Sequence, residues 1–132
     1  EIEIKKCVKF LGEKNLAILH CTSTYPASAN ELNLNYIPKL KKLFKKSVIG
    51  YSGHETNLSS ALAANILGAK IIERHITLDR SMWGTDQKSS IEALGLARLI
   101  RDLKLANESL GDGIKKVYNS ELEIKKKLRL FS

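Results

Sequence analysis

Two histidines, His54 and His75, are the side chains of this sequence whose type and spacing most readily suggest chemistry. They lie 21 residues apart, about one strand–helix unit, and each follows a short apolar run. If the two runs form neighbouring strands, about 4.8 Å apart, both imidazoles lie at one end of a sheet and could share a metal ion. Neutral imidazole is a common ligand of divalent transition metals. The spacing alone also allows a coincidental pair of histidines.

A metal held by two protein ligands has open positions for water and substrate, so this site would be catalytic rather than structural. The third histidine, His20, lies within an apolar run and is predicted to be a core or hydrogen-bonded residue. Cys7 and Cys21 form neither a CxxC zinc motif nor a disulfide framework. We interpret them as buried or idle thiols of a reducing compartment.

Hydroxyl and carboxylate side chains lie near the same apolar runs. Ser23, Tyr25 and Ser52 carry hydroxyls that suit the oxygens of a phosphate or a carboxylate. Asp86 follows the third apolar run and could accept hydrogen bonds from a sugar hydroxyl or join the outer shell of a metal. The alternative for each is an ordinary loop residue. The sequence has no Ser-His-Asp order, P-loop or GxGxxG motif.

Alternating helices and strands must position these residues. Apolar spacing predicts helices at residues 2–11, 34–44, 58–67 and 91–105, and strands at residues 16–21, 47–51 and 70–76. Strands that are separated by helices pair in parallel through right-handed crossovers. The candidate residues then lie at the carboxyl ends of parallel strands, where α/β proteins bind their ligands.

The predicted fold class is α/β, a partial (β/α)8 TIM barrel with about three parallel strands alternating with helices. A complete barrel needs about 250 residues, whereas the sequence has 132. Three parallel strands leave two open edges, so we expect a fragment of a barrel or a chain that pairs with a second copy. A small, complete three-stranded α/β domain is the alternative.

Composition and charge exclude several classes of protein. The chain is 43% hydrophobic and 27% charged, which is typical of a folded domain rather than a disordered one. Its net charge of +8 comes partly from lysine clusters at 39–46 and 115–127. These clusters lack the interleaved aromatics of single-strand binders, so we expect no nucleic-acid partner. With no apolar run of ~18–20 residues and no signal-peptide pattern, we also expect no membrane contact and a cytoplasmic protein.

Four strings of the sequence resemble one known family. They are HCTSTYP at 20–26, IGYSGHE at 49–55, ERHITLDR at 73–80 and GTDQ at 84–87. In this order and spacing they resemble the sialic acid synthases, that is, the N-acetylneuraminate synthases and their nonulosonate relatives. Residues 1–111 then correspond to the C-terminal part of the catalytic TIM barrel. Residues 112–132 resemble the family's basic connector to a C-terminal antifreeze-like domain.

The resemblance implies a phosphoenolpyruvate-dependent enzyme. Members of the family condense phosphoenolpyruvate with an N-acetylated hexosamine, such as N-acetylmannosamine, and give a nonulosonic (sialic) acid and phosphate. They use a divalent metal, typically Mn2+, with Mg2+ or Co2+ as alternatives. His54 and His75 match the two metal-binding histidines, and they are therefore the implied catalytic residues of this chain.

The substrate contacts are implied in the same way. Tyr25 and Ser52 match positions that contact phosphoenolpyruvate, and Asp86 matches a position that holds the acceptor sugar. Ser23 stands at a phosphoenolpyruvate contact where characterised members can carry asparagine. The loop at 83–87 is expected to shape the sugar pocket, and N-acetylmannosamine, a 2,4-diacetamido sugar and a phosphorylated sugar all stay open as acceptors.

Two parts of the family enzyme are not in the sequence. One is the first half of the barrel, which supplies phosphate-binding lysines and a catalytic glutamate. The other is the antifreeze-like domain, whose arginine reaches the partner's site in the family dimer. We therefore expect the parent enzyme to be a homodimer and the isolated chain to be inactive. The alternative is a catalytically inactive half-barrel that self-associates through its strand edges.

Overall fold

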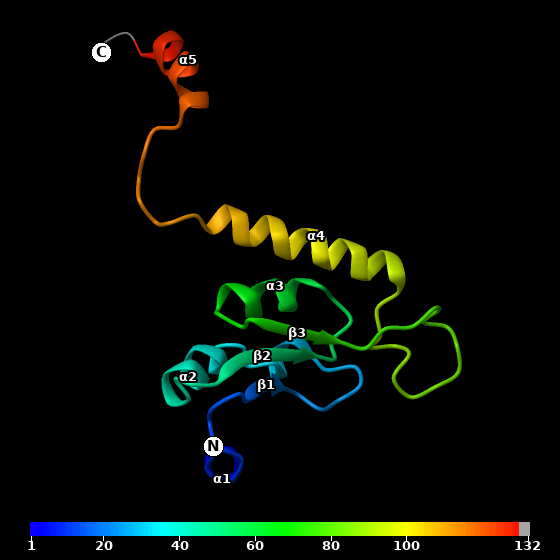
Figure 1. Ribbon diagram of the computed structural model, residues 1–132. Helices are drawn as coiled ribbons and strands as arrows, with labels where there is room; N and C mark the ends of the chain where they lie inside the picture. The colour runs from blue at the N-terminus through cyan, green and yellow to red at the C-terminus, as the bar shows by residue number, and fades with distance from the viewer. Residues whose placement is uncertain (130–132) are drawn as a thin grey trace.

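The computed structural model of the chain describes residues 1–129 and has an α/β architecture (Figure 1). Its elements in chain order are α1 (Ile2–Leu11), β1 (Ala17–Cys21), the short 3-10 helix η1 (Ala29–Glu31), α2 (Tyr36–Leu43), β2 (Val48–Gly53), α3 (Ser59–Ile66), β3 (Ile71–Arg74), α4 (Ala93–Leu110) and α5 (Asn119–Leu128). Strands and helices alternate from β1 to α4, as predicted. Among the helices of residues 1–129, none is long and apolar enough to cross a membrane.

The three strands form one parallel sheet in the order β1-β2-β3. Cys21 at the end of β1 pairs with Ser52 of β2, and Ser52 pairs with Glu73 of β3. This register brings the carboxyl ends of all three strands to one edge of the sheet. The predicted parallel sheet is therefore confirmed, with each crossover made by a helix as parallel pairing requires.

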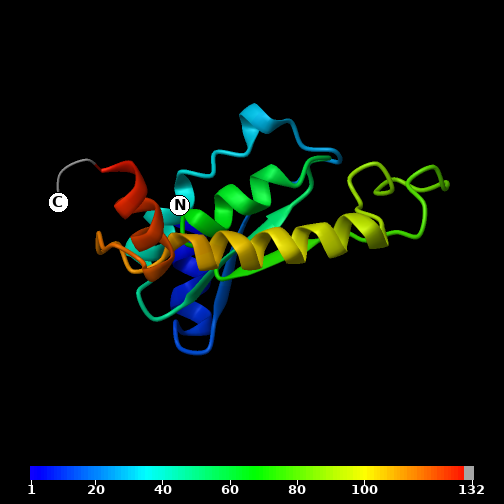
Figure 2. The ribbon, with the colours of Figure 1, turned by 90° about the horizontal axis from the view of Figure 1, so that it is seen from above.

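Helices cover one face of the sheet. On this face Ile49 and Tyr51 of β2 belong to one buried cluster with Ile37 and Leu40 of α2 and Ala64 of α3. In Figure 1, α3 lies between the sheet and α4, and Figure 2 shows α4 running lengthwise beside α3. Because side chains alternate along a strand, every second residue of β2 contributes to this core.

The other face of the sheet is open. Val48 of β2 and Ile71 of β3 point to this side, and they are 46% and 38% exposed. Gly50 of β2 is the register partner of Ile71. Helices on one face of parallel strands and apolar side chains on the other are the arrangement of part of a (β/α)8 barrel, in which the second face lines the barrel interior. The predicted fold class is confirmed.

Several boundaries differ from those predicted. β2 continues beyond the strand predicted at 47–51, because its pairing with the neighbouring strands extends through Ser52 and Gly53. The helix predicted at 91–105 continues as α4 to residue 110 and is followed by Gly111, whose φ of 58° ends it. These shifts place Ser52 inside a strand, where its backbone is fixed on both sides.

The C-terminal segment, predicted only as a basic connector, contains the helix α5. The backbone N–H of Tyr118 donates to Glu121 Oε1 at 3.1 Å, and the backbone N–H of Glu121 donates to Tyr118 O at 2.9 Å. This reciprocal pair satisfies backbone groups at the start of the helix. An extended segment separates α5 from the end of α4 (Figure 1).

We predict that Gly50→Ala destabilises the fold by about 1–3 kcal/mol because of overpacking. A Cβ at Gly50 would lie 2.9 Å from both the Cβ and the backbone oxygen of Ile71, and 3.1 Å from Leu19 Cγ. The matched control is Gly95→Ala in α4, where the new Cβ meets Ile91 Cβ at 3.6 Å. That substitution should stabilise the helix by about 0.5–1 kcal/mol. Urea denaturation followed by circular dichroism measures both, and effects of the same sign would contradict the prediction.

Candidate metal and substrate site

The ends of β2 and β3 bring His54 and His75 together. His54 follows Gly53 and His75 follows Arg74, and these two preceding residues are paired across the sheet. The imidazole ring centroids lie 5.1 Å apart, with the ring planes at 69°. Two imidazoles on one tetrahedral ion, each with a metal–nitrogen bond of about 2.1 Å, have centroids roughly 5 Å apart. The spacing of the two rings therefore suits one shared ion.

The ring of His54 has a fixed orientation. Its Nδ1 lies 2.9 Å from the carbonyl oxygen of Thr22, and because a carbonyl can only accept, Nδ1 carries the hydrogen. The lone pair is then on Nε2, which lies 3.5 Å from Ser52 Oγ. His54 is buried, at 4% exposed. A hydrogen bond from the second ring nitrogen to a backbone carbonyl is typical of histidines that bind metals.

His75 is more exposed than His54 and lies beside Asp86. Its Nδ1 is 3.8 Å from Asp86 Oδ2, and the two side chains are 36% and 47% exposed. The loop that carries Asp86 returns to the sheet at Ile91, whose backbone N–H donates to His75 O at 2.9 Å. An isolated bridge between Ile76 and Ile91 closes the same loop. The structure thus places Asp86 at the site through contacts between the two ends of its loop.

Tyr25 packs against both histidines. Its ring centroid lies 4.5 Å from that of His54 and 5.5 Å from that of His75. The loop after β1 is anchored here, because the backbone N–H of Ala27 donates to His54 O at 3.1 Å. Ser23 Oγ lies 3.3 Å from Cys21 Sγ, which is itself 3.7 Å from His54 Nδ1. Ser23 is therefore joined to the site through Cys21, whereas Tyr25 is in direct contact with the histidines.

Ser52 is bound to Glu73, a glutamate that no sequence motif singled out. Ser52 Oγ donates to Glu73 Oε1 at 2.7 Å. The two residues are register partners on the open face of the sheet, so Glu73 belongs to the same polar cluster as the predicted site residues. The strand register was the signal that could have identified Glu73, since it places this side chain directly beside Ser52.

A second polar cluster, which the sequence analysis also missed, lies on the helix-covered side of the same strand ends. Arg74 Nη1 donates to Glu55 Oε1 at 2.6 Å, and the two side chains are 2% and 1% exposed. Tyr51 OH donates to Glu55 Oε2 at 2.8 Å. Burial, reinforced by this hydrogen bond, raises the pKa of the Tyr51 hydroxyl above its ordinary value, so the hydroxyl stays protonated as a donor.

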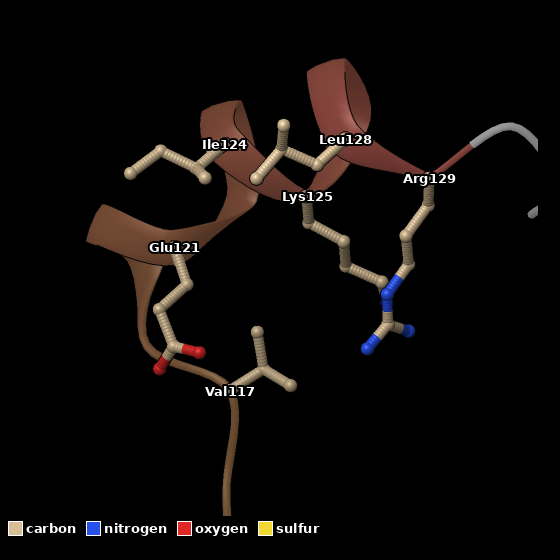
Figure 3. A pocket seen from close by; sticks show the side chains of 6 residues that line it. All are labelled: Val117, Glu121, Ile124, Lys125, Leu128 and Arg129. Carbon is tan, nitrogen blue, oxygen red and sulfur yellow. The ribbon is translucent and has the colours of Figure 1, made fainter.

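An apolar groove elsewhere on the chain has no residue in common with this site. It lies on α5, and Figure 3 shows the side chains that line it. They are Val117, Glu121, Ile124, Lys125, Leu128 and Arg129.

The loop at 83–87, which is expected to shape the sugar pocket, is open to solvent, because its Trp83 is fully exposed.

Three parallel strands have helices on one face and polar side chains at their carboxyl ends, which is the arrangement of part of a (β/α)8 barrel. Residues 1–115 match the NeuB family. The chain belongs to the NeuB family.

Several relatives of the chain are named as synthases of nonulosonic acids. The chain is 43% identical over 114 residues to human N-acetylneuraminate-9-phosphate synthase, covering 86% of this chain and 32% of the relative. It is 44% identical over 115 residues to N,N'-diacetyllegionaminic acid synthase of Campylobacter jejuni, covering 87% of this chain and 34% of the relative. The crystal structure of the N-acetylneuraminic acid (sialic acid) synthetase of Leptospira borgpetersenii, in complex with citrate, matches with a TM-score of 0.76 and 33% identity, over 98% of this chain and 46% of that one. The chain thus spans about a third of the length of these curated relatives.

We predict that His54 and His20 adopt opposite tautomers in the metal-free chain. His54 should carry its hydrogen on Nδ1, which faces Thr22 O, whereas His20 should carry it on Nε2, which lies 2.7 Å from Leu32 O. Long-range proton–nitrogen NMR spectra at about pH 8, where an ordinary imidazole is neutral, distinguish the two forms. His20 serves as the internal control, and an Nε2–H tautomer at His54 would contradict the site geometry.

Proposed function

We propose that this chain is part of an N-acetylneuraminate-type synthase. The reaction condenses phosphoenolpyruvate with an N-acetylated hexosamine, N-acetylmannosamine or a relative of it, and gives a nonulosonic acid and phosphate. The observation that carries the proposal is the pairing of His54 and His75, at a ring separation of 5.1 Å, at adjoining strand ends of a NeuB-family chain. Tyr25, a position that the resemblance implies for phosphoenolpyruvate, lies against both rings. Asp86, the position implied for the sugar, lies beside His75.

A divalent metal is part of the proposal, Mn2+ with Mg2+ or Co2+ as alternatives. Its protein ligands would be His54, through the unprotonated Nε2, and His75. Within residues 1–129, no group of three or more His, Cys, Asp and Glu side chains is placed to hold an ion. Two imidazoles alone suit an ion that takes its other ligands from water and substrate, as in catalytic sites. When bound, such an ion would act as a Lewis acid toward the aldehyde of the open-chain sugar.

The residues of the chain would bind and orient the two substrates. In the proposed reaction C3 of phosphoenolpyruvate forms a bond to the aldehyde carbon, water adds at C2, and phosphate leaves by cleavage of its C–O bond. Tyr25, Ser52 and Ser23 would donate hydrogen bonds to the anionic oxygens of phosphoenolpyruvate. Asp86 would accept one from the acceptor sugar. Orientation of this kind lowers the barrier of a two-substrate reaction, by roughly 7–11 kcal/mol at best.

Ser52 has a single proton to donate, and in the structure it donates that proton to Glu73. Binding of phosphoenolpyruvate through Ser52 therefore requires the hydroxyl to turn away from Glu73. This rotation is inexpensive because Glu73 is exposed, so that water replaces the hydrogen bond it loses.

The proposal extends to a homodimeric, cytoplasmic parent enzyme with neither nucleic-acid nor membrane partners, and to an isolated chain without synthase activity. The two curated relatives carry different product names, one a 9-phosphate and the other a diacetylated acid. These names support an acetamido sugar as the acceptor class. The possible acceptor sugars would differ in whether they carry a phosphate and in whether they carry a second acetamido group.

We predict that the folded chain binds one Mn2+ ion, and that His54→Ala and His75→Ala each abolish this binding because one imidazole holds the ion far more weakly than two. The free Mn2+ signal in EPR measures binding, and circular dichroism verifies that each variant is folded. His20→Gln is the matched control, since His20 bonds to Leu32 O away from the two paired rings. A folded chain without Mn2+ binding, or binding that survives in both alanine variants, would exclude this metal site.

We further predict that Ser52→Ala weakens phosphoenolpyruvate binding about tenfold or more, the usual cost of losing a hydrogen bond to a charged group. The broadening of the phosphorus NMR signal in the presence of Mn2+ detects even weak binding. Ser47→Ala is the control, because Ser47 precedes β2 at its opposite end, where its hydroxyl donates to Glu13 O at 3.1 Å. Equal affinity in Ser52→Ala and the parent chain would remove Ser52 from the substrate site.

A further inference from the structure

The buried ion pair between Glu55 and Arg74 is adjacent in the chain to both histidines of the site. Glu55 follows His54, and Arg74 precedes His75. The two charged groups meet at 2.6 Å with almost no exposure to solvent. We propose that this ion pair positions His54 and His75 for binding one metal ion, an inference that rests on the proposed function.

Arg74 joins the segments that carry the site. Besides the Glu55 carboxylate, its guanidinium donates to the backbone oxygens of Glu55, of Asn57 at 3.1 Å and of Ser89 at 3.4 Å. Ser89 Oγ in turn donates to the backbone oxygen of Asp86 at 3.0 Å. One side chain of β3 thus holds the segment after β2 and the loop of Asp86. A guanidinium can do this because its donors are arranged in a rigid, planar fork, which an ammonium group lacks.

Glu55 acts from the opposite side of the backbone to His54. Its carboxylate accepts from Tyr51 OH at 2.8 Å on the helix-covered face, whereas His54 contacts Ser52 and Tyr25. Gly53 leaves room for this arrangement, because a Cβ there would lie 2.9 Å from Glu55 Oε2 and from Tyr51 Cε1. Glu55 therefore cannot reach a ligand beside His54, and it is a positioning residue rather than a catalytic one.

A contribution to stability alone would not explain this pair. Buried ion pairs lose most of their attraction to the cost of desolvation, and apolar replacements of similar volume are often as stable. What apolar packing does not supply is direction, since the hydrophobic effect is non-directional. The function of the pair is therefore to set the separation of the two imidazoles.

Two variants and one control test this inference in the full chain. Arg74→Lys keeps the positive charge beside Glu55 but loses the fork that reaches the backbone oxygens. The double variant Glu55→Gln with Arg74→Met removes both charges, keeps an acceptor for Tyr51 OH and leaves no unpaired charge buried. Leu40→Ala is the control, because it creates a cavity in the core under α2 without touching the histidines.

The first measurement is the nuclear Overhauser effect between the imidazole protons of His54 and His75 in the metal-free chain, and the second is the Kd for Mn2+ by EPR. We expect both variants to fold, to lose the Overhauser contact and to bind Mn2+ at least tenfold more weakly. Leu40→Ala should lower the melting temperature, yet keep the contact and a Kd within twofold of the parent.

The inference is overturned if either folded variant keeps the Overhauser contact and the Kd of the parent chain. It is also overturned if Leu40→Ala loses the contact and weakens Mn2+ binding as much as the two variants do. If the parent chain shows the contact but binds no Mn2+, the proposed metal site fails. The Overhauser contact then still decides whether the ion pair sets the separation of the two rings.

Discussion

The parallel register of the three strands is the constraint on which the site depends. Because Cys21, Ser52 and Glu73 are aligned across the sheet, the segments that follow the three strands leave from one edge. Tyr25, His54 and His75 then meet without any of them being near another in the sequence. A slip of one residue in either pairing would turn the side chains of a whole strand to the other face. The sheet therefore sets the positions of His54 and His75, and the loops add Tyr25 and Asp86 to the site.

Because side chains alternate along each strand, the two faces of the sheet carry different groups at the strand ends. The open face carries Ser52 and Glu73, and it is the side on which His54 contacts Ser52 and Tyr25. The helix-covered face carries Tyr51 and Arg74, which both bind Glu55. Groups that can meet a ligand and groups that hold the backbone in place thus lie back to back, one residue apart in sequence.

Much of the fold was predictable because it follows from periodicity, whereas parts of the site were not. His54 and His75 are 21 residues apart, which is the length of about one strand–helix unit, so their proximity could be predicted. The approach of Asp86 to His75 depends on the bridge between the two ends of its loop, a tertiary contact that no local pattern encodes. Charged residues at the end of an apolar run are usually exposed. Glu73 is exposed as expected, whereas the side chain of Arg74 is buried. The difference arises because helices cover only one face of the sheet.

A metal site with only two protein ligands has little tolerance for displacement. Productive geometry requires the ligand side chains to be held within about 0.5 Å of their positions. Two ligand side chains cannot hold the strands and loops that carry them this precisely. Here Nδ1 of His54 is bound to the backbone oxygen of Thr22, in the loop after the neighbouring strand β1. The guanidinium of Arg74 joins the main chain after β2 to that of the loop after β3. The ring of His54 is thus held through a bond that leaves its Nε2 free, and the backbone next to His75 is held through Arg74. In the proposed metal site, the remaining coordination positions would then be available to water and the substrates.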